Sequence, residues 1–269
     1  MTVEKGGLVA ANIIVCMRSR VACVAVLLLV FGPGIASAQT ADRPNEPQRE
    51  IPSFRSLFLD IPQDLANVVR PQTAIILGLG GGVSAGVHSS DVRFAHDAVS
   101  NHGLDEALDP GQVIGGAYAQ IGGAVATYLT GRLTHSPRVA TLGAELVRAQ
   151  IVNSVMTEGI KMAVRRQRPD GTPYSFPSGH ASGTFATATV LQREFGWKVG
   201  APAYALATYV ALSRMTENKH YASDIAFGAA IGIVAGRAVR FHTGNHDFAI
   251  SPMAVPRGAG VSFNLVDKH

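Results

Sequence analysis

The sequence predicts an all-α protein whose core is a bundle of six helices. Val, Ile and Leu recur at helical spacing through long runs rich in Ala and Gly, and no strand-like alternation persists. Small residues let helices approach each other closely, so these runs suit a tight bundle. Charged residues make up only 16% of the 269 residues, which argues against a disordered chain or a coiled coil.

The chain begins with the pattern of a secretory signal peptide, expected over residues 1–38. Arg18 and Arg20 precede a short apolar run, and Ala36-Ser37-Ala38 provides a cleavage site. Met17 is an alternative start, and an uncleaved anchor helix is the alternative reading of the apolar run. Both cysteines fall within this segment, so the mature chain would contain no disulfide. We therefore expect an exported protein, periplasmic or secreted.

Residues 39–70 are expected to form a polar leader followed by an amphipathic helix. The first twelve residues are polar and contain Pro, which is typical of a flexible leader. Pro62 then interrupts the expected helix, and Asp60 is placed to cap the turn that follows. The apolar residues that would share one helical face are Phe54, Leu57, Phe58, Ile61, Leu65 and Val68.

The main domain is expected over residues 71–241. Its six helices are predicted near 71–87, 111–131, 138–166, 179–195, 200–214 and 222–241. The tail, 242–269, has a different pattern: two apolar runs flank Pro256-Arg257-Gly258, which is compatible with a small β-hairpin.

A first polar cluster lies near the predicted end of the third helix. Lys161 and Arg168 are seven residues apart, or two helical turns, so both can face one site. Pro169 would end the helix there, and Arg165 and Arg166 add positive charge. A solvated helix end is the alternative interpretation of this cluster.

A second cluster, Phe176-Pro177-Ser178-Gly179-His180, opens the fourth helix. The free N–H groups and the positive end of the helix dipole form an anion site. Gly179 lets the backbone approach a ligand closely, and His180 is placed to transfer a proton. An ordinary N-cap at Ser178 is the structural alternative.

A third cluster contains Arg214, His220 and Asp224. At i and i+4, the Asp224 carboxylate can fix the imidazole tautomer of His220 and leave the other ring nitrogen as a nucleophile. Two residues are too few for a metal site. His88 and His96, with Asp91, are expected to have surface or capping roles, and a metal site is the alternative interpretation of this group.

Taken in order, the three clusters resemble the full signature of the type 2 phosphatidic acid phosphatase (PAP2) superfamily. This superfamily includes bacterial acid phosphatases and vanadium haloperoxidases. The matching elements are Lys161-x6-Arg168-Pro169, Pro177-Ser178-Gly179-His180 and Ser213-Arg214-x5-His220-x3-Asp224. The resemblance covers about residues 71–241 and implies a PAP2-type helical bundle.

The resemblance implies a metal-independent phosphatase that hydrolyses phosphate monoesters, lipid phosphates or small phosphomonoesters, through a phosphohistidine. His220 would be the nucleophile, Asp224 would orient it, and His180 would be the general acid and then the base. The phosphoryl oxygens would be held by Lys161, Arg168 and Arg214, with the N–H groups of Ser178 and Gly179. No cofactor is expected, and vanadate should bind as a phosphate mimic.

Two alternatives remain open: a vanadium-dependent haloperoxidase, which such a short chain disfavours, and a membrane-embedded polyprenyl diphosphate phosphatase. The uncharged runs 71–90 and 110–131 are long enough to span a bilayer, but small and polar residues dominate them. We therefore expect an exported globular enzyme that can lie against a membrane through its 54–68 face. No basic block indicates a nucleic-acid partner.

Overall fold

The computed structural model describes residues 50–100, 102–239, 246–255 and 258–267. The expected signal peptide and nearly all of the polar leader lie outside the described residues. The longer helices are α4 (Pro71–His88), α8 (Ala117–Leu133), α9 (Pro137–Val164), α10 (Gly179–Phe195), α11 (Trp197–Thr216) and α12 (Ala222–Ala238). The shorter ones are α2 (Ser56–Leu59), α3 (Ile61–Val68), α5 (Asp91–Val99), α6 (His102–Leu108) and α7 (Pro110–Gly115).

The body of the protein is helical, as predicted, but the predicted number of six helices is too low. Each of the six expected segments contains a helix, and α2 and α3 lie where the separate amphipathic helix was expected, while α5 and α6 are additional. The second expected helix is also broken into α7 and α8 at Gly116, whose ψ of 145° is extended. An extended residue cannot continue a helical hydrogen-bond ladder, so the chain changes direction there.

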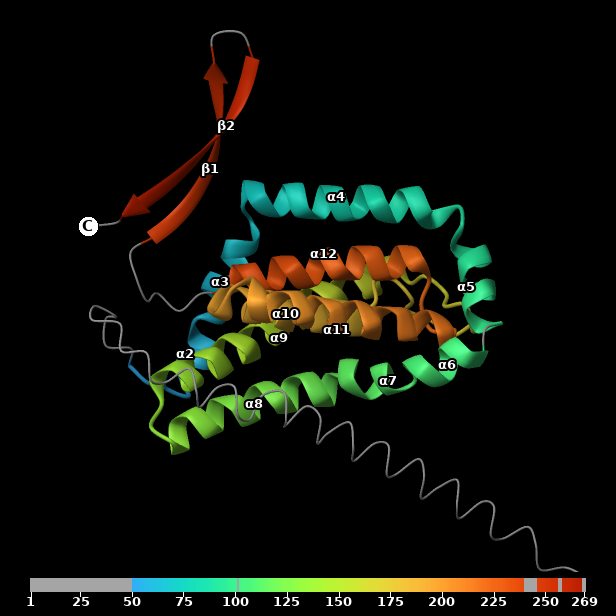
Figure 1. The fold of residues 1–269 in the computed structure, drawn as a ribbon, viewed down its shortest axis with the longest axis horizontal. Coiled ribbons are helices and arrows are strands. Elements are labelled where there is room, and N and C mark those ends of the chain that lie inside the picture. Colours follow the sequence, from blue (N-terminus) through green and yellow to red (C-terminus); the bar gives the residue numbers. More distant parts are fainter. Residues whose placement is uncertain (1–49, 101, 240–245, 256–257, 268–269) are drawn as a thin grey trace, which may run out of the picture.

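The centre of the bundle is the close packing of α10 against α12. Helix α12 presents Gly228, Gly232 and Gly236 to α10, one at every fourth position. A Cβ atom at Gly228 would lie 2.7 Å from the carbonyl oxygen of Ser178, so the two backbones touch. Helix α11 packs on α10, α8 packs on α9, and α4 lies along α12 (Figure 1). The prediction that small residues permit tight helix packing is confirmed.

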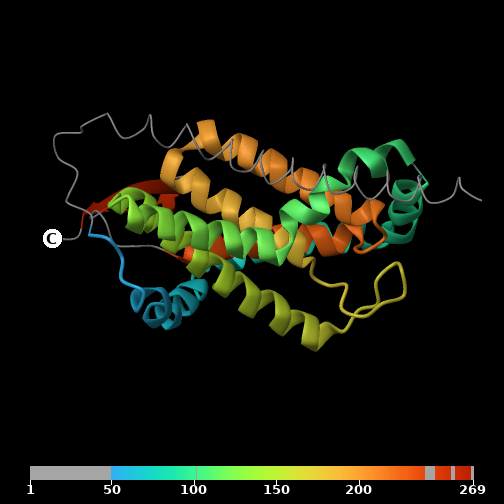
Figure 2. The ribbon, with the colours of Figure 1, turned by 90° about the horizontal axis from the view of Figure 1, so that it is seen from below.

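The loop between α9 and α10 lies at one end of the bundle. Figure 2 shows this loop at the same end as α5 and α6. Helices α4 and α12 also meet there, since Ser84 of α4 donates a hydrogen bond to the backbone oxygen of Ser223, at 2.9 Å. The candidate site residues are carried by the last turns of α9 and α11, by the loops that follow these two helices, and by the first turns of α10 and α12.

The N-terminal helical segment differs from the expected single amphipathic helix. It is divided into α2 and α3, and Phe54 and Phe58 are exposed whereas Leu57 is buried. Asp60 makes no capping bond, because its carboxylate accepts from Arg148 of α9, at 3.0 Å. The same guanidinium binds both oxygens of the buried Asp64, at 2.6 Å each. An ion-pair network therefore fastens this segment to the bundle.

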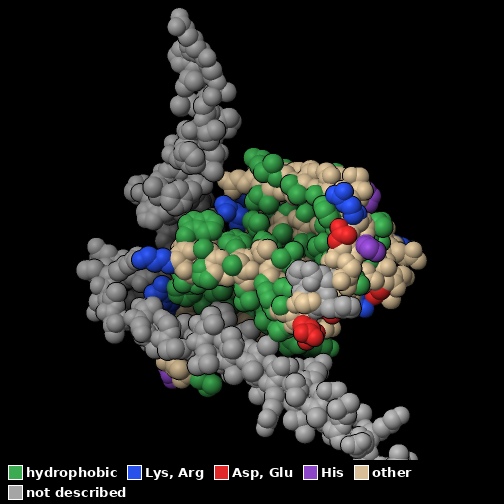
Figure 3. Space-filling view, turned by 45° about the vertical axis from the view of Figure 1, so that its right-hand side comes forward, with side chains coloured by type: hydrophobic (Ala, Val, Ile, Leu, Met, Phe, Trp, Pro, Cys, Tyr) green, Lys and Arg blue, Asp and Glu red, His purple; other side chains and the backbone are tan. Residues whose placement is uncertain are grey.

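The tail contains two antiparallel strands, β1 (His246–Val255) and β2 (Gly258–Asp267), with Val255 opposite Gly258. Within the described part of the chain, none of the helices is both long enough and apolar enough to cross a bilayer. Hydrophobic side chains nevertheless cover much of the surface seen in Figure 3. Exposed apolar side chains include Ile75, Leu79 and Val83 of α4 and Ile121, Val125 and Leu129 of α8.

Candidate functional site

The first cluster is divided between a helix end and a loop. Helix α9 ends at Val164 because Arg165 adopts a left-handed conformation with φ of 52°. Arg168 therefore lies in the loop, where its N–H donates to the oxygen of Thr172 at 2.8 Å. The prediction that Lys161 and Arg168 lie two turns apart on one helix is therefore wrong, because only Lys161 belongs to α9.

The structure still places Lys161 at the start of α10. Its Nζ atom would lie 3.4 Å from a Cβ added at Gly179, so the ammonium group faces the first turn of that helix. The same Nζ also donates to Glu158, at 2.9 Å, on the exposed side of α9. Lys161 is thus in reach of an anion bound at the N-terminus of α10.

The second cluster forms the N-terminus of α10, as the sequence predicts. Ser178 is the N-cap, and its hydroxyl oxygen accepts from the N–H of Ala181 at 3.4 Å. The N–H of Ser178 itself donates to the backbone oxygen of Asp224, at 3.0 Å. This bond corrects one expectation: the amide of Ser178 is used between α10 and α12 and does not supplement the cations. The amide of Gly179, at the first helical position, stays available by its place in the helix.

In the third cluster, His220 and Asp224 are neighbours but do not lie on one helix. Helix α12 begins at Ala222, so His220 belongs to the preceding loop, where its N–H donates to the oxygen of Arg214 at 3.1 Å. The Nδ1 atom of His220 lies 3.8 Å from Oδ2 of Asp224, which is an ion-pair distance and too long for a hydrogen bond. Both side chains are buried.

Four polar side-chain atoms at this end of the bundle are buried without a hydrogen-bond partner among the described residues: Nε of Arg168, Nε of Arg214, Nδ1 of His220 and Oε1 of Glu217. Buried polar atoms of this kind normally have partners. Arg214 is only partly neutralised, by a hydrogen bond of 2.7 Å from its NH1 group to Glu217. The cluster thus offers unused donors and positive charge to an anion.

The same surroundings depress the pKa values of both histidines. Burial, followed by the positive charge of Arg214, the proximity of His220 and the charge of Lys161, lowers the pKa of His180 to about 3. Burial also lowers the pKa of His220, although the Asp224 carboxylate opposes the shift. These couplings indicate that the two imidazoles and the cations face one small volume.

Four side chains that the sequence did not single out as site residues hold the Asp224 carboxylate and its surroundings: Asp91, Arg166, Ser175 and Ser223. Arg166 was predicted only to add charge, and Asp91 only to cap a helix or lie at the surface. Asp91 is in fact 2% exposed. Three of the four lie within or next to the motifs in sequence, but no local pattern distinguishes Asp91.

An apolar groove of about 420 Å³ lies beside this network. Its walls come from α4, the end of α9, the following loop and α12, and include Ala85, Val164, Phe176, Phe227, Arg166 and Ser223. The rings of Phe176 and Phe227 stack with their centroids 5.0 Å apart. The groove therefore joins an apolar wall to the residues that surround Asp224.

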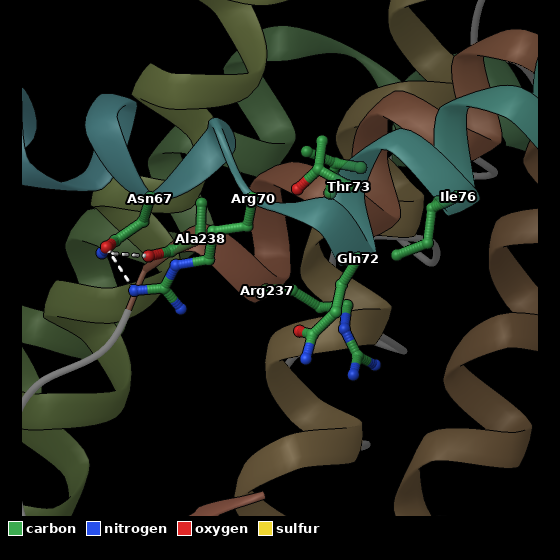
Figure 4. A pocket seen from close by; sticks show the side chains of 8 residues that line it. Asn67, Arg70, Gln72, Thr73, Ile76, Arg237 and Ala238 are labelled. Carbon is green, nitrogen blue, oxygen red and sulfur yellow. Dashed lines mark hydrogen bonds between the residues drawn. The ribbon is translucent and has the colours of Figure 1, made fainter. Parts of the chain in front are cut away.

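A second pocket, of about 20 Å³, lies at the opposite ends of α4 and α12 (Figure 4), and its volume is that of about one water molecule. Arg70 donates there to Asn67, which donates to the oxygen of Ala238. This pocket is not lined by His180 or His220, and it lies at the other end of the bundle. In the residues that the structure describes, no three His, Cys, Asp or Glu side chains are grouped as metal ligands.

Comparison with known proteins finds one matching family and relatives that align with only part of this chain. The family described as the PAP2 superfamily matches residues 139–246. Lipid A 1-phosphatase of Porphyromonas gingivalis is 40% identical over 85 residues, which cover 30% of this chain and 19% of that protein. Decaprenylphosphoryl-5-phosphoribose phosphatase of Mycobacterium tuberculosis is 41% identical over 90 residues, which cover 30% of this chain and 49% of that protein.

The matches to these relatives thus span at most half of their length. Among solved structures, a transmembrane PAP2-type phosphatidylglycerolphosphate phosphatase from Bacillus subtilis aligns with a TM-score of 0.49 and 18% identity. The alignment covers 68% of this chain and 92% of that one.

Proposed function

We propose that this chain, which belongs to the PAP2 superfamily through residues 139–246, is a phosphatase that works through a phosphohistidine. The proposal rests on one observation: three cations, the buried His220 and the partly buried His180 gather at the N-terminus of α10. Fixed cations and amides of this kind stabilise the charge on the equatorial oxygens of a phosphoryl group in transfer.

In the first step, Nε2 of His220 attacks phosphorus. Its Nδ1 atom faces the Asp224 carboxylate, which leaves Nε2 as the nucleophilic nitrogen. An N–P bond forms while the P–O bond to the leaving group breaks. Lys161, Arg168 and Arg214 hold the three equatorial oxygens, so no metal ion is required in this scheme.

His180 transfers the proton in both steps. With a pKa of about 3, its imidazole is neutral at pH 7 unless an anion lies beside it. A bound phosphate dianion offsets the neighbouring positive charges and raises this pKa, so His180 takes up a proton with the substrate. It then protonates the leaving oxygen. In the second step it removes a proton from water, whose oxygen attacks phosphorus as the N–P bond breaks.

The substrate that fits best is a phosphate monoester attached to a lipid or polyprenyl group. The apolar groove beside the site supports this choice, because Val164, Phe176 and Phe227 offer a wall for an apolar chain. The names of the two relatives also specify lipid A and a decaprenyl compound. A small phosphomonoester remains the second candidate.

The test is hydrolysis of an aryl phosphate and of phosphatidic acid in detergent micelles, with EDTA present. We expect phosphate release in both cases and a higher kcat/KM for the lipid. His220→Ala should lower kcat by about 10³-fold or more. His96→Ala is the matched control, because the side chain of His96 is 81% exposed. Equal activity of wild type and His220→Ala would overturn the phosphohistidine scheme, and activity only after metal is restored would overturn metal independence.

We also infer that the enzyme acts outside the cytoplasm, in contact with a membrane surface. The pattern in residues 1–38 supports export, and the exposed apolar side chains of α4 and α8 support contact with lipid. Fractionation of cells that express the full chain should place the mature enzyme in the periplasm or on the outer face of a membrane. Recovery with the cytoplasmic fraction would overturn this inference.

A further inference from the structure

Arg166 occupies a bridging position between two buried carboxylates. Its NH1 group donates to Oδ1 of Asp224 at 2.7 Å, and its NH2 group donates to Oδ2 of Asp91 at 2.8 Å. The guanidinium also lies over the ring of Tyr221, 4.2 Å from the centroid. Asp91 is 2% exposed and Asp224 is fully buried, so Arg166 is a cation placed between two anions that have little access to water.

The remaining carboxylate oxygens are also held in place. The other oxygen of Asp224, Oδ2, accepts from Ser175 at 2.5 Å and from the N–H of Tyr221 at 2.8 Å, and it faces His220. Asp91 accepts from the N–H and the hydroxyl of Ser223, at 3.0 and 2.5 Å. Ser223 in turn accepts from NH1 of Arg166, at 2.7 Å. The network therefore fixes both oxygens of Asp224.

The charges of this network balance only if Arg166 is present. Without the cation between them, two buried carboxylates cannot both stay ionised at low cost, so the pKa of at least one must rise. A protonated Asp224 would no longer attract a positive charge on His220. The charged and titratable groups that face this network are His88, 3.1 Å from Asp91, and His220, with Arg168 and Arg214 acting on His220 from its other side.

We propose that Arg166 is a positioning residue for the histidine nucleophile, anchored by Asp91. It keeps Asp224 ionised and fixes the direction in which its carboxylate faces His220. Helix α5, which carries Asp91, thereby contributes to the site although it lies outside the three motifs. This inference rests on the proposed phosphohistidine chemistry, and it adds two residues to which the motifs assign no role.

The experiment compares pH profiles of kcat/KM for wild type, Arg166→Met and Arg166→Lys with an aryl phosphate. In Arg166→Met we expect kcat to fall by about 10- to 100-fold, with KM changed less than about threefold. The acidic limb of the profile should move to higher pH, because Asp224 must then lose a proton before His220 can be polarised. Arg166→Lys, which keeps one positive charge, should restore part of kcat and part of the shift.

The matched control is Arg165→Met. Arg165 is the neighbouring arginine, but its side chain is exposed and its Nε donates only to the oxygen of Met162 at 3.0 Å. We expect wild-type kcat and an unchanged pH profile. Melting curves of all variants show whether any loss of activity reflects unfolding.

A double variant separates charge from packing. If charge balance is the reason, Asp91→Asn in the Arg166→Met background removes the second carboxylate, moves the acidic limb back and raises kcat above that of Arg166→Met. A purely structural role predicts that the second substitution lowers activity further, and this result would overturn the inference. So would a folded Arg166→Met enzyme with a wild-type profile.

His220→Ala is measured in the same series. If that variant is as active as wild type, the proposed function fails. If it is inactive while Arg166→Met behaves like wild type, only the role of Arg166 fails.

Discussion

Replacing His180 with Gln should make the folded protein less sensitive to acid, although it removes the proposed proton donor. In the folded state, burial and the charge of Arg214 lower the pKa of His180 from an ordinary value of 6.5 to about 3. Above pH 6.5 the imidazole is neutral in both the folded and the unfolded chain. As the pH falls below 6.5, the unfolded chain binds a proton that the folded chain does not bind until about pH 3. Acid therefore lowers the free energy of unfolding across this window.

The size of the effect follows from the two pKa values. Between pH 7.5 and pH 5.0, one such histidine lowers the free energy of unfolding by about 2 kcal/mol. His220 acts in the same direction, because burial lowers its pKa too, but this contribution is common to wild type and variant. The lowered pKa of Asp224 affects stability only near and below the ordinary range of a carboxylate. The difference between the two proteins then isolates His180.

The assay is urea denaturation at pH 7.5 and pH 5.0, followed by a helical signal. Between pH 7.5 and pH 5.0, the free energy of unfolding of wild type should fall by about 2 kcal/mol more than that of His180→Gln. His96→Gln is a substitution at an exposed site, so its free energy of unfolding should fall by as much as that of wild type. An equal decrease in wild type and His180→Gln would refute the conclusion that the pKa of His180 is lowered in the folded protein.

Three further predictions concern packing, an ion pair and the anion site. Gly228→Ala should lower the free energy of unfolding by about 1–3 kcal/mol and should lower kcat, since the new Cβ would lie 2.7 Å from the Ser178 carbonyl oxygen. Gly82→Ala, with open space around it, should be neutral or stabilising in thermal melts; equal effects would refute the packing argument. Arg148→Met should lower the free energy of unfolding by about 3 kcal/mol in urea, because Asp64 is left buried without this cation; a loss under 1 kcal/mol would refute it. Orthovanadate should inhibit aryl phosphate hydrolysis competitively in EDTA, and failure to compete would contradict the phosphoryl site.

Local features of the fold were predictable because their causes are local. Ser178 is the N-cap of α10, as the sequence indicates, since its hydroxyl reaches an amide only three residues away. The segments rich in small residues are helical, as predicted, because the helical spacing of their Val, Ile and Leu residues is also a local property of the sequence. Helix ends were less predictable: Arg165 ends α9 in a left-handed conformation for which Pro169, four residues later, gives no signal.

The candidate residues were also readable from the sequence, but their geometry was not. Motif spacing identified Lys161, Arg168 and His220, yet the expected shared helical faces do not exist, because Arg168 and His220 lie in loops. In this loop the backbone of Arg168 bonds to residues 171 and 172, and the N–H of Ser175 donates to the oxygen of Arg166 at 2.8 Å, so the chain turns back on itself. Spacing on an ideal helix could not represent this path.

By itself, the sequence determined the helical class, the N-cap of α10 and the cations and histidines that form the candidate site. Periodicity, capping and motif spacing act over a few residues, and they can be read along the chain. Only the tertiary structure decided how the polar groups are used: the Ser178 amide binds Asp224, and Arg166 joins Asp224 to Asp91, 75 residues before Arg166. Those partners depend on which distant segments pack together, and burial makes each unpaired group costly, so the packing settles the pairing.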